Sequence, residues 1–165
     1  HASLTARRDP NRQLFVDNYT TIPILVTATL NINAAYVAAR ATESALSVLL
    51  SALSFESLDF AQSIHLSDIY AILQSVPGVD SVDIDLLMFK QKADATDTEF
   101  DDFLDGRGIT RLPDGAPKAV QSHLRIFPAR LNAVSKDPAV FGAEQASIES
   151  SSQDVTILTK GGLPE

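Results

Sequence analysis

Apolar and polar residues alternate along the chain between residues 22 and 32. One face of this stretch is entirely apolar and contains Ile22, Ile24, Val26, Ala28, Leu30 and Ile32. The other face mixes polar and apolar residues, and contains Pro23, Leu25, Thr27, Thr29 and Asn31. A sustained period of two with many β-branched side chains predicts a β-strand that buries one face.

The spacing changes to that of a helix between residues 36 and 54. Apolar side chains recur there every four residues, at Val37, Ala41, Ala45, Leu49 and Leu53. This spacing predicts a long amphipathic helix. A second helical pattern spans residues 66–76, and we expect Ser67 to be its N-cap. Pro77 and Gly78 predict the end of this second helix.

Residues 81–89 return to the period of a strand. One face contains Val82, Ile84, Leu86 and Met88, and the other contains Asp83, Asp85, Leu87 and Phe89. Because two strands joined through helices can lie parallel in one sheet, we expect a parallel pair. Because the polar residues of both predicted strands lie on one face, we expect helices to cover only the other face of the sheet. The expected fold class is therefore α+β, a small mixed sheet with a ferredoxin-like β-α-α-β core and C-terminal β segments.

The pattern divides the chain into four parts. We expect residues 1–21 to be a linker or arm and residues 22–89 to be the α+β core. Residues 90–121 are interpreted as an acidic insertion loop, because residues 94–105 carry acids without a base. Residues 122–165 are expected to form C-terminal β segments and a tail. Since the sequence starts without a methionine, we expect a piece of a longer chain.

Composition narrows the function classes. A length of 165 residues suffices for one buried core without disulfide staples. The net charge of −8 disfavours a nucleic-acid binder, which needs a basic face. The absence of cysteine excludes disulfides, thiol catalysis and cysteine zinc sites. No apolar run is long enough to predict a membrane span.

Candidate chemistry is sparse along the chain. An EF-hand loop starting at Asp97 would place Asp102 where glycine is required and Gly108 where glutamate is required. His65 and His123 each lack a second histidine at ligand spacing, and no Gly-x-Ser-x-Gly elbow exists. We therefore predict that the chain is not an enzyme, and we assign no catalytic, cofactor-binding or metal-binding residues.

Some apolar residues are candidates for contacts with another chain. Phe55, Leu58 and Phe60 fit two interpretations, either part of the core or an exposed apolar lip for a partner. Each predicted strand has one face that mixes polar and apolar residues. We expect the apolar side chains on these faces to be buried against another surface. The candidate interface residues are Leu25, Phe55, Leu58, Phe60, Leu87 and Phe89.

The order of three short motifs resembles a known family. Phe60-Ala61-Gln62, Leu66-Ser67-Asp68-Ile69 and Val76-Pro77-Gly78-Val79 follow the long predicted helix and precede the second strand. This order is similar to the C-terminal region of baseplate J-like proteins, the wedge proteins of contractile phage tails and contractile injection systems. The family often has glycine where this chain has Ala61. The resemblance covers most of the chain, and it is best over residues 22–89.

The resemblance implies a structural protein of a virion tail baseplate or injection particle, assembled in the bacterial cytoplasm. Its implied partners are other wedge subunits and hub or sheath-proximal proteins in a homo- or hetero-oligomer, with no nucleic acid and no membrane span. The alternative is a ferredoxin-like regulatory domain that binds a small molecule in a pocket. A third hypothesis is an enzyme that uses the acidic residues with a divalent metal.

Overall fold

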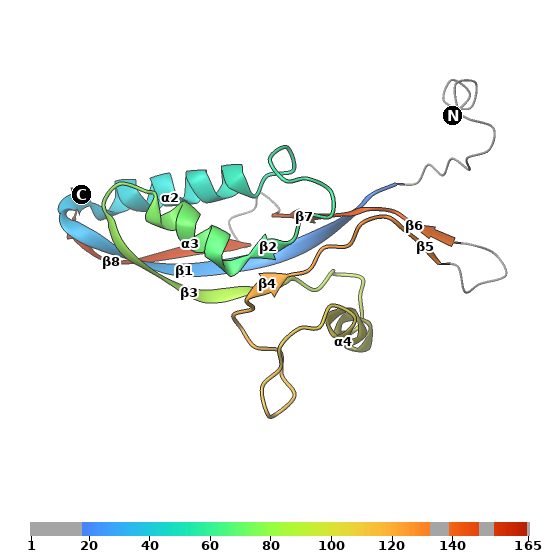
Figure 1. Ribbon diagram of the computed structural model, residues 1–165. Coiled ribbons are helices and arrows are strands. Elements are labelled where there is room, and N and C mark those ends of the chain that lie inside the picture. The colour runs from blue at the N-terminus through green and yellow to red at the C-terminus, as the bar shows by residue number, and fades with distance from the viewer. Residues whose placement is uncertain (1–17, 133–138, 149–153, 165) are drawn as a thin grey trace, which may run out of the picture.

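The computed structural model describes residues 18–132, 139–148 and 154–164 (Figure 1). They form an α+β fold in which a mixed four-stranded sheet has helices packed against it, as the sequence predicts. The elements, in order, are β1 (Thr20–Val37), α2 (Ala38–Ala52), β2 (Ile64–His65), α3 (Leu66–Gln74), β3 (Val79–Phe89), α4 (Asp97–Asp105), β4 (His123–Leu124), β5 (Arg130–Asn132), β6 (Ala139–Phe141), β7 (Glu144–Ser147) and β8 (Val155–Leu163).

Strand β1 is the central strand of the sheet. Strand β3 pairs with one of its edges in the antiparallel direction. Along the other edge, β7 pairs with the first residues of β1 and β8 with the later ones, both parallel. Two separate pairs, β2–β4 and β5–β6, are antiparallel. Helices α2 and α3 lie over the same side of the sheet (Figure 1).

The expected parallel pairing of the first two predicted strands is wrong, because β1 and β3 are antiparallel. A single crossover helix reverses the chain twice and returns the next strand parallel. Here the connection contains both α2 and α3, so the chain reverses three times before β3. The last reversal is the turn at Pro77 and Gly78, and Gly78 has a φ of 92°.

The predicted core face of β1 is confirmed. Every second residue from Ile22 to Ile32 is buried, and the strand is longer than predicted. Helix α2 covers this face with Ala41, Ala45 and Leu49, and α3 adds Ile69 and Leu73. Buried residues of the later segments join the same cluster: Leu104, Leu124, Ile126, Ala146 and Val155.

A β-bulge in β3 changes which side chains reach the core. Thr27 of β1 pairs with Leu86, but its neighbour Ala28 pairs with Ile84, so Asp85 has no partner across the ladder. An extra residue shifts the alternation by one position and exchanges the two faces beyond it. As a result, Leu87 is 0% exposed and Phe89 is 1% exposed.

The chain enters α3 differently from the prediction. The N-cap is His65, not Ser67, and no side chain caps the helix. His65 keeps the extended backbone of β2, so the strand leads directly into the helix. The Ser67 hydroxyl donates instead to Asp68 Oδ1 at 3.4 Å.

The proposed linker falls mostly outside the described residues. Residues 1–17 are not described, whereas Thr20 and Thr21 already belong to β1. The expected acidic insertion loop is not a loop throughout, because it contains the nine-residue helix α4. The C-terminal β segments are present as β4 to β8.

Candidate interaction surface

Three aromatic rings form an exposed cluster at one end of the sheet layer. Tyr19, Phe55 and Phe60 are 50%, 47% and 52% exposed. The Tyr19 ring centroid lies 5.3 Å from that of Phe55 and 5.6 Å from that of Phe60, and the two phenylalanine rings meet edge to face at 6.5 Å. We call these residues the aromatic cluster. Its rings contact one another while remaining open to solvent.

Strand β7 holds the connection that carries Phe55 and Phe60. The buried side chain of Gln145 donates through Nε2 to the Phe55 carbonyl at 2.8 Å and to the Leu58 carbonyl at 2.6 Å. The Ala61 amide donates to the Glu144 carbonyl at 2.8 Å. These bonds fix the backbone on both sides of the segment that carries Phe55 and Phe60. The two rings are therefore attached to a well-ordered backbone.

Tyr19 is positioned by a close backbone approach just before β1. The Thr20 amide donates to the Ala143 carbonyl at 3.0 Å. A Cβ at Gly142 would lie 1.9 Å from the Asn18 carbonyl oxygen, so only glycine allows this approach. Tyr19 therefore comes from a different part of the chain than its two aromatic neighbours, and the fold brings them together.

The structure separates the six candidate interface residues. Phe55 and Phe60 are exposed, as the lip interpretation expects, but Leu58 between them is buried in the core. Leu87 and Phe89 are also buried within this chain because of the bulge, so the interface prediction is wrong for Leu58, Leu87 and Phe89.

Leu25 lies on the outer face of the sheet and is half-buried. Its cross-strand partner on that face is Met88, also half-buried, and Leu158 of β8 is exposed there. Thr29 donates from Oγ1 to Asp85 Oδ2 at 2.7 Å across this face. The face therefore mixes apolar side chains with satisfied polar ones.

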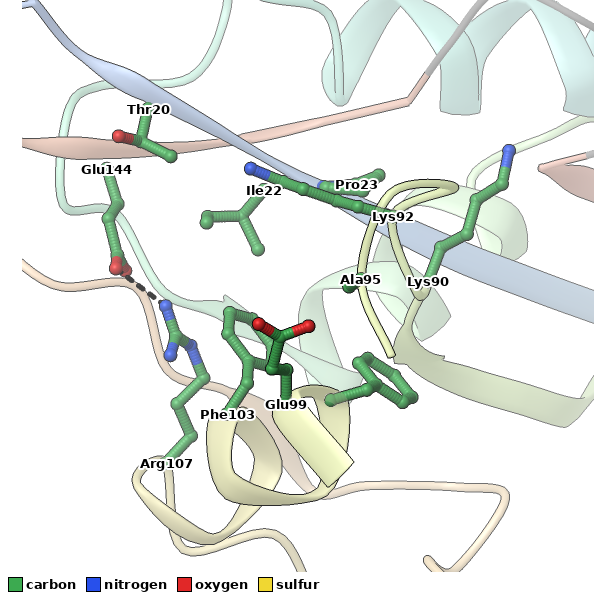
Figure 2. Close-up of a pocket in the computed structure, with 11 residues that line it drawn as sticks. Thr20, Ile22, Pro23, Lys90, Lys92, Ala95, Glu99, Phe103, Arg107 and Glu144 are labelled. Carbon is green, nitrogen blue, oxygen red and sulfur yellow. Dashed lines mark hydrogen bonds and ion pairs between the residues drawn. The ribbon is translucent and has the colours of Figure 1, made fainter. Parts of the chain in front are cut away.

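A cavity of about 250 Å³ lies between β1, α4 and the start of β7 (Figure 2). Phe100, Phe103 and Ile22 supply apolar walls, and Lys92 and Glu99 lie beside it. This volume is below the 300–1,000 Å³ common for small-molecule pockets.

Arg107 closes one end of the cavity with a buried ion pair. Its Nη2 donates to Glu144 Oε1 at 2.6 Å, and its guanidinium carbon lies 3.7 Å from the Phe103 ring centroid. Burial lowers the pKa of Arg107, and the attraction of Glu144 opposes that shift. Glu144 Oε2 also accepts from the Phe127 amide at 2.9 Å. The pair joins the end of α4 to β7, which is a structural role.

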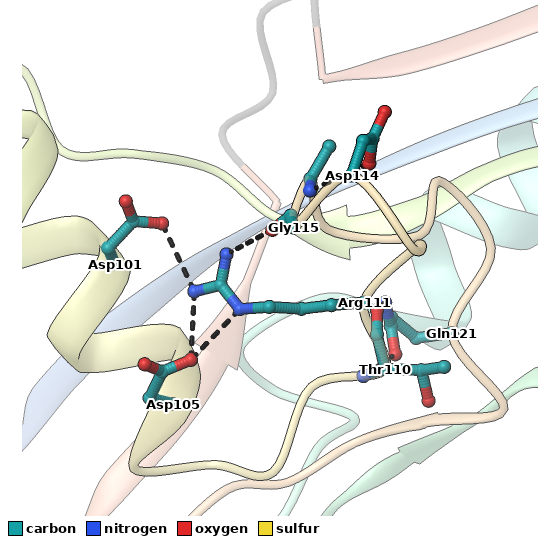
Figure 3. A network of polar contacts seen from close by, with 8 residues as sticks. Asp101, Asp105, Thr110, Arg111, Asp114, Gly115 and Gln121 are labelled. Atoms are coloured by element: carbon teal, nitrogen blue, oxygen red, sulfur yellow. Dashed lines mark hydrogen bonds and ion pairs between the residues drawn. The ribbon is translucent and has the colours of Figure 1, made fainter.

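Two carboxylates of the acidic segment, those of Asp101 and Asp105, pair with Arg111. Arg111 donates to Asp105 Oδ1 at 2.8 Å, to Asp101 Oδ1 at 3.1 Å and to the Gly115 carbonyl at 2.8 Å (Figure 3). Hydrogen bonds with Asp105 and Asp101 raise the pKa of Arg111. The side-chain amide of Gln121 closes the following turn through Thr110.

Helix α4 begins with a capping box. The Glu99 amide donates to Thr96 Oγ1 at 3.3 Å, and the Thr96 amide donates to Glu99 Oε2 at 2.8 Å. The bond from the Thr96 amide is the larger cause of the lowered pKa of Glu99, followed by the bond from its hydroxyl.

Two histidines that look unrelated in the sequence meet in the fold. His65 of β2 and His123 of β4 are cross-strand partners, and their ring centroids lie 6.0 Å apart. The pair could not be predicted from the sequence, because the two-residue strand β2 is too short to show a period. The available signal was that each histidine neighbours an apolar residue. Ile64 precedes His65, and Leu124 follows His123.

Within the described ranges, no group of three or more histidine, cysteine or acidic residues is placed to hold a metal ion. Over the same residues, no helix combines the length and the apolar character needed to cross a bilayer. Comparisons with family models, curated proteins and solved structures gave no match for this chain.

Proposed function

We propose that this chain is a structural module of a contractile tail or injection-system baseplate, the C-terminal domain of a wedge protein. In this proposal the aromatic cluster packs against a neighbouring subunit, and the chain carries no catalytic step. The observation that supports the proposal best is the cluster itself, three half-exposed rings whose backbone segments are fixed by hydrogen bonds to Ala143, Glu144 and Gln145. Aromatic side chains on such supports are enriched in interface cores.

The backbone at Ala61 adds support for the family resemblance. Ala61 has a φ of 63°, and it is the one non-glycine residue with positive φ in the described part of the chain. This conformation favours glycine, because a Cβ crowds the backbone there. The baseplate J-like resemblance places glycine at this position. If this chain had the same backbone as the family at this position, its geometry would favour glycine, as observed.

The order of elements also agrees with the resemblance. A long strand and helix precede the connection with Phe60 and Ala61, and a short helix and the Val76–Val79 turn then lead into β3. We infer that the particle assembles in the bacterial cytoplasm and that the partners are wedge, hub or sheath-proximal subunits.

The regulatory alternative receives less support from the cavity. Arg107 and Lys90, two of the cations that line it, already pair with Glu144 and Asp154 at 2.6 Å. A ligand anion would compete with both carboxylates for these cations.

The direct test is assembly of the parent particle with the double substitution Phe55→Asp and Phe60→Asp. Two carboxylates in an apolar contact would be desolvated without partners, so sheathed particles should be lost from electron micrographs. Leu112→Asp is the matched control, because Leu112 is similarly exposed but lies in the turn after α4.

Circular dichroism and thermal melting of the purified variants must first show that both remain folded. Normal particle numbers with the folded double variant would contradict the proposed contact. A gene neighbourhood with sheath, tube and spike genes is the second expectation. A neighbourhood with none of them would contradict the baseplate assignment while leaving the aromatic contact open to test.

A further inference from the structure

We propose that His65 and His123 form a two-ligand site for a borderline divalent transition metal ion such as Zn²⁺. The two residues are direct partners in the antiparallel pair of β2 and β4. Side chains of directly opposed residues point to the same face of a sheet. Both histidines are exposed, so an ion can reach them from solvent.

The hydrogen-bond pattern brings these side chains close. The Leu66 amide donates to the Ser122 carbonyl at 3.0 Å, which makes residues 66 and 122 a hydrogen-bonded pair. In an antiparallel ladder the adjacent pair is then non-hydrogen-bonded, with its Cα atoms about 4.5 Å apart and its side chains closer together. His65 and His123 occupy that adjacent pair.

The spacing of the rings suits one shared ion. A metal bound about 2.0–2.1 Å from an imidazole nitrogen lies about 3.2 Å from the ring centroid, so two rings that share an ion with a tetrahedral angle have centroids about 5.2 Å apart. The observed separation is 6.0 Å, with an angle of 24° between the ring planes. Because the rings are stacked, both must rotate about their side-chain torsions and approach slightly before one nitrogen of each faces the same ion.

The register of the pair is fixed by burial. Ile64 and Leu124, the neighbouring cross-strand partners, are 3% and 0% exposed on the core side. A slip by one residue would bring the histidines to the core and expose the apolar pair. Ser122 Oγ lies 3.3 Å from His123 Nδ1, which leaves Nε2 of that ring for the ion.

The chemistry of the donors selects the ion. Imidazole nitrogen suits zinc, copper and nickel, whereas magnesium and calcium take oxygen ligands. Closed structural zinc sites use four protein ligands, so two ligands leave positions for water. The site would therefore be open and exchangeable, and its effect would be to link β4 to the sheet layer through β2.

The test is a calorimetric titration of the full chain with Zn²⁺. Wild type should bind one ion saturably, and His65→Gln and His123→Gln should each abolish binding at zinc concentrations that saturate the wild type. His1→Gln is the control, because it removes the remaining histidine of the sequence and should bind as the wild type does. Mg²⁺ should give no signal.

Imidazole nitrogen shifts in NMR spectra provide the second readout. Zinc should move the ring resonances of His65 and His123 together, and a chelator should reverse the change. Circular dichroism of the glutamine variants shows whether they remain folded. Undiminished zinc binding by either folded variant, loss of binding in His1→Gln, or the absence of saturable binding in wild type would overturn the site.

Discussion

The sheet layer and the segment from Asp94 to Leu124 are held together by different interactions. In the layer of β1, β3, β8, α2 and α3, apolar side chains such as Ile24, Leu30 and Leu49 are fully buried. In the acidic segment, α4 fully buries only Leu104 and packs Phe100 and Phe103 partly against the core, and caps, ion pairs and turns made by Thr96, Arg107 and Arg111 add to these contacts.

The difference predicts where each region is sensitive to mutation. A buried apolar side chain is stabilised in proportion to the area it removes from water, so truncation has a large effect wherever it occurs in the layer. Exposed polar contacts are weak one at a time. The acidic segment should therefore depend strongly on Arg107, which is buried, and weakly on its exposed contacts.

The largest effect is expected at the bulge. Leu87→Ala should lower the free energy of unfolding by about 3 kcal/mol, because it empties a fully buried site. Leu86→Ala is the matched control in the same strand, and it should cost roughly 1 kcal/mol, since Leu86 is half-buried on the outer face. Urea unfolding measures both. A larger loss for Leu86 would mean that the bulge is absent.

The second prediction tests the polar connection between α4 and β7. Arg107→Met leaves Glu144, whose side chain is only 14% exposed, without its cation and should cost about 3 kcal/mol in urea unfolding. Arg111→Met, the same substitution at an exposed ion-pair cluster, should change the unfolding midpoint little. If the two substitutions had equal effects, the two arginines would not differ in burial as the structure shows.

The contrast also explains what the sequence could predict. The regular elements of the layer follow from the period of two in β1 and the four-residue spacing in α2. The direction of β3 was predicted wrongly, because the expectation treated the connection as a single crossover, whereas α2 and α3 reverse the chain three times. The bulge at Asp85 could not be detected in the sequence, because one inserted residue does not change the amino-acid composition. The bulge turns Leu87 and Phe89 toward the core, whereas the sequence predicted them at an interface.

The third prediction concerns the capping box of α4. Thr96→Ala removes the acceptor for the Glu99 amide and should cost about 1 kcal/mol at neutral pH. Thr96→Ala also removes the bond from the Thr96 hydroxyl to the Glu99 carboxylate, which helps to lower the pKa of Glu99 below its ordinary 4.5. The contribution of this second bond is present above that value and is lost as pH falls through the lowered pKa. Unfolding of both proteins across this acidic range should show their difference narrowing. A constant difference would exclude a contribution from the bond between the Thr96 hydroxyl and the ionised Glu99 carboxylate.

The smallest effect is expected in the connection that carries the aromatic cluster. Ala61→Gly relieves the positive φ but increases the freedom of the unfolded chain, so a net gain of roughly 0.5 kcal/mol is expected. Ala71→Gly inside α3 is the control and should be destabilising, because glycine disfavours helix. Thermal melting compares the two. Destabilisation at both positions would contradict the strained backbone at Ala61.

The candidate surface was predictable only in part. An exposed lip at Phe55 and Phe60 was one of two interpretations, and a local pattern could not choose between them. Tyr19 was missed because its contact depends on the approach of Gly142 to Asn18, far away in the sequence. The pairing of His65 with His123 was missed for another reason. The two strands that carry these residues are too short to show a period.

Electron cryomicroscopy of the assembled parent particle would show whether the aromatic cluster is an interface. We expect the rings of Tyr19, Phe55 and Phe60 to be covered by side chains of another subunit. A reconstruction in which all three rings remain open to solvent in the complete particle would rule out this contact.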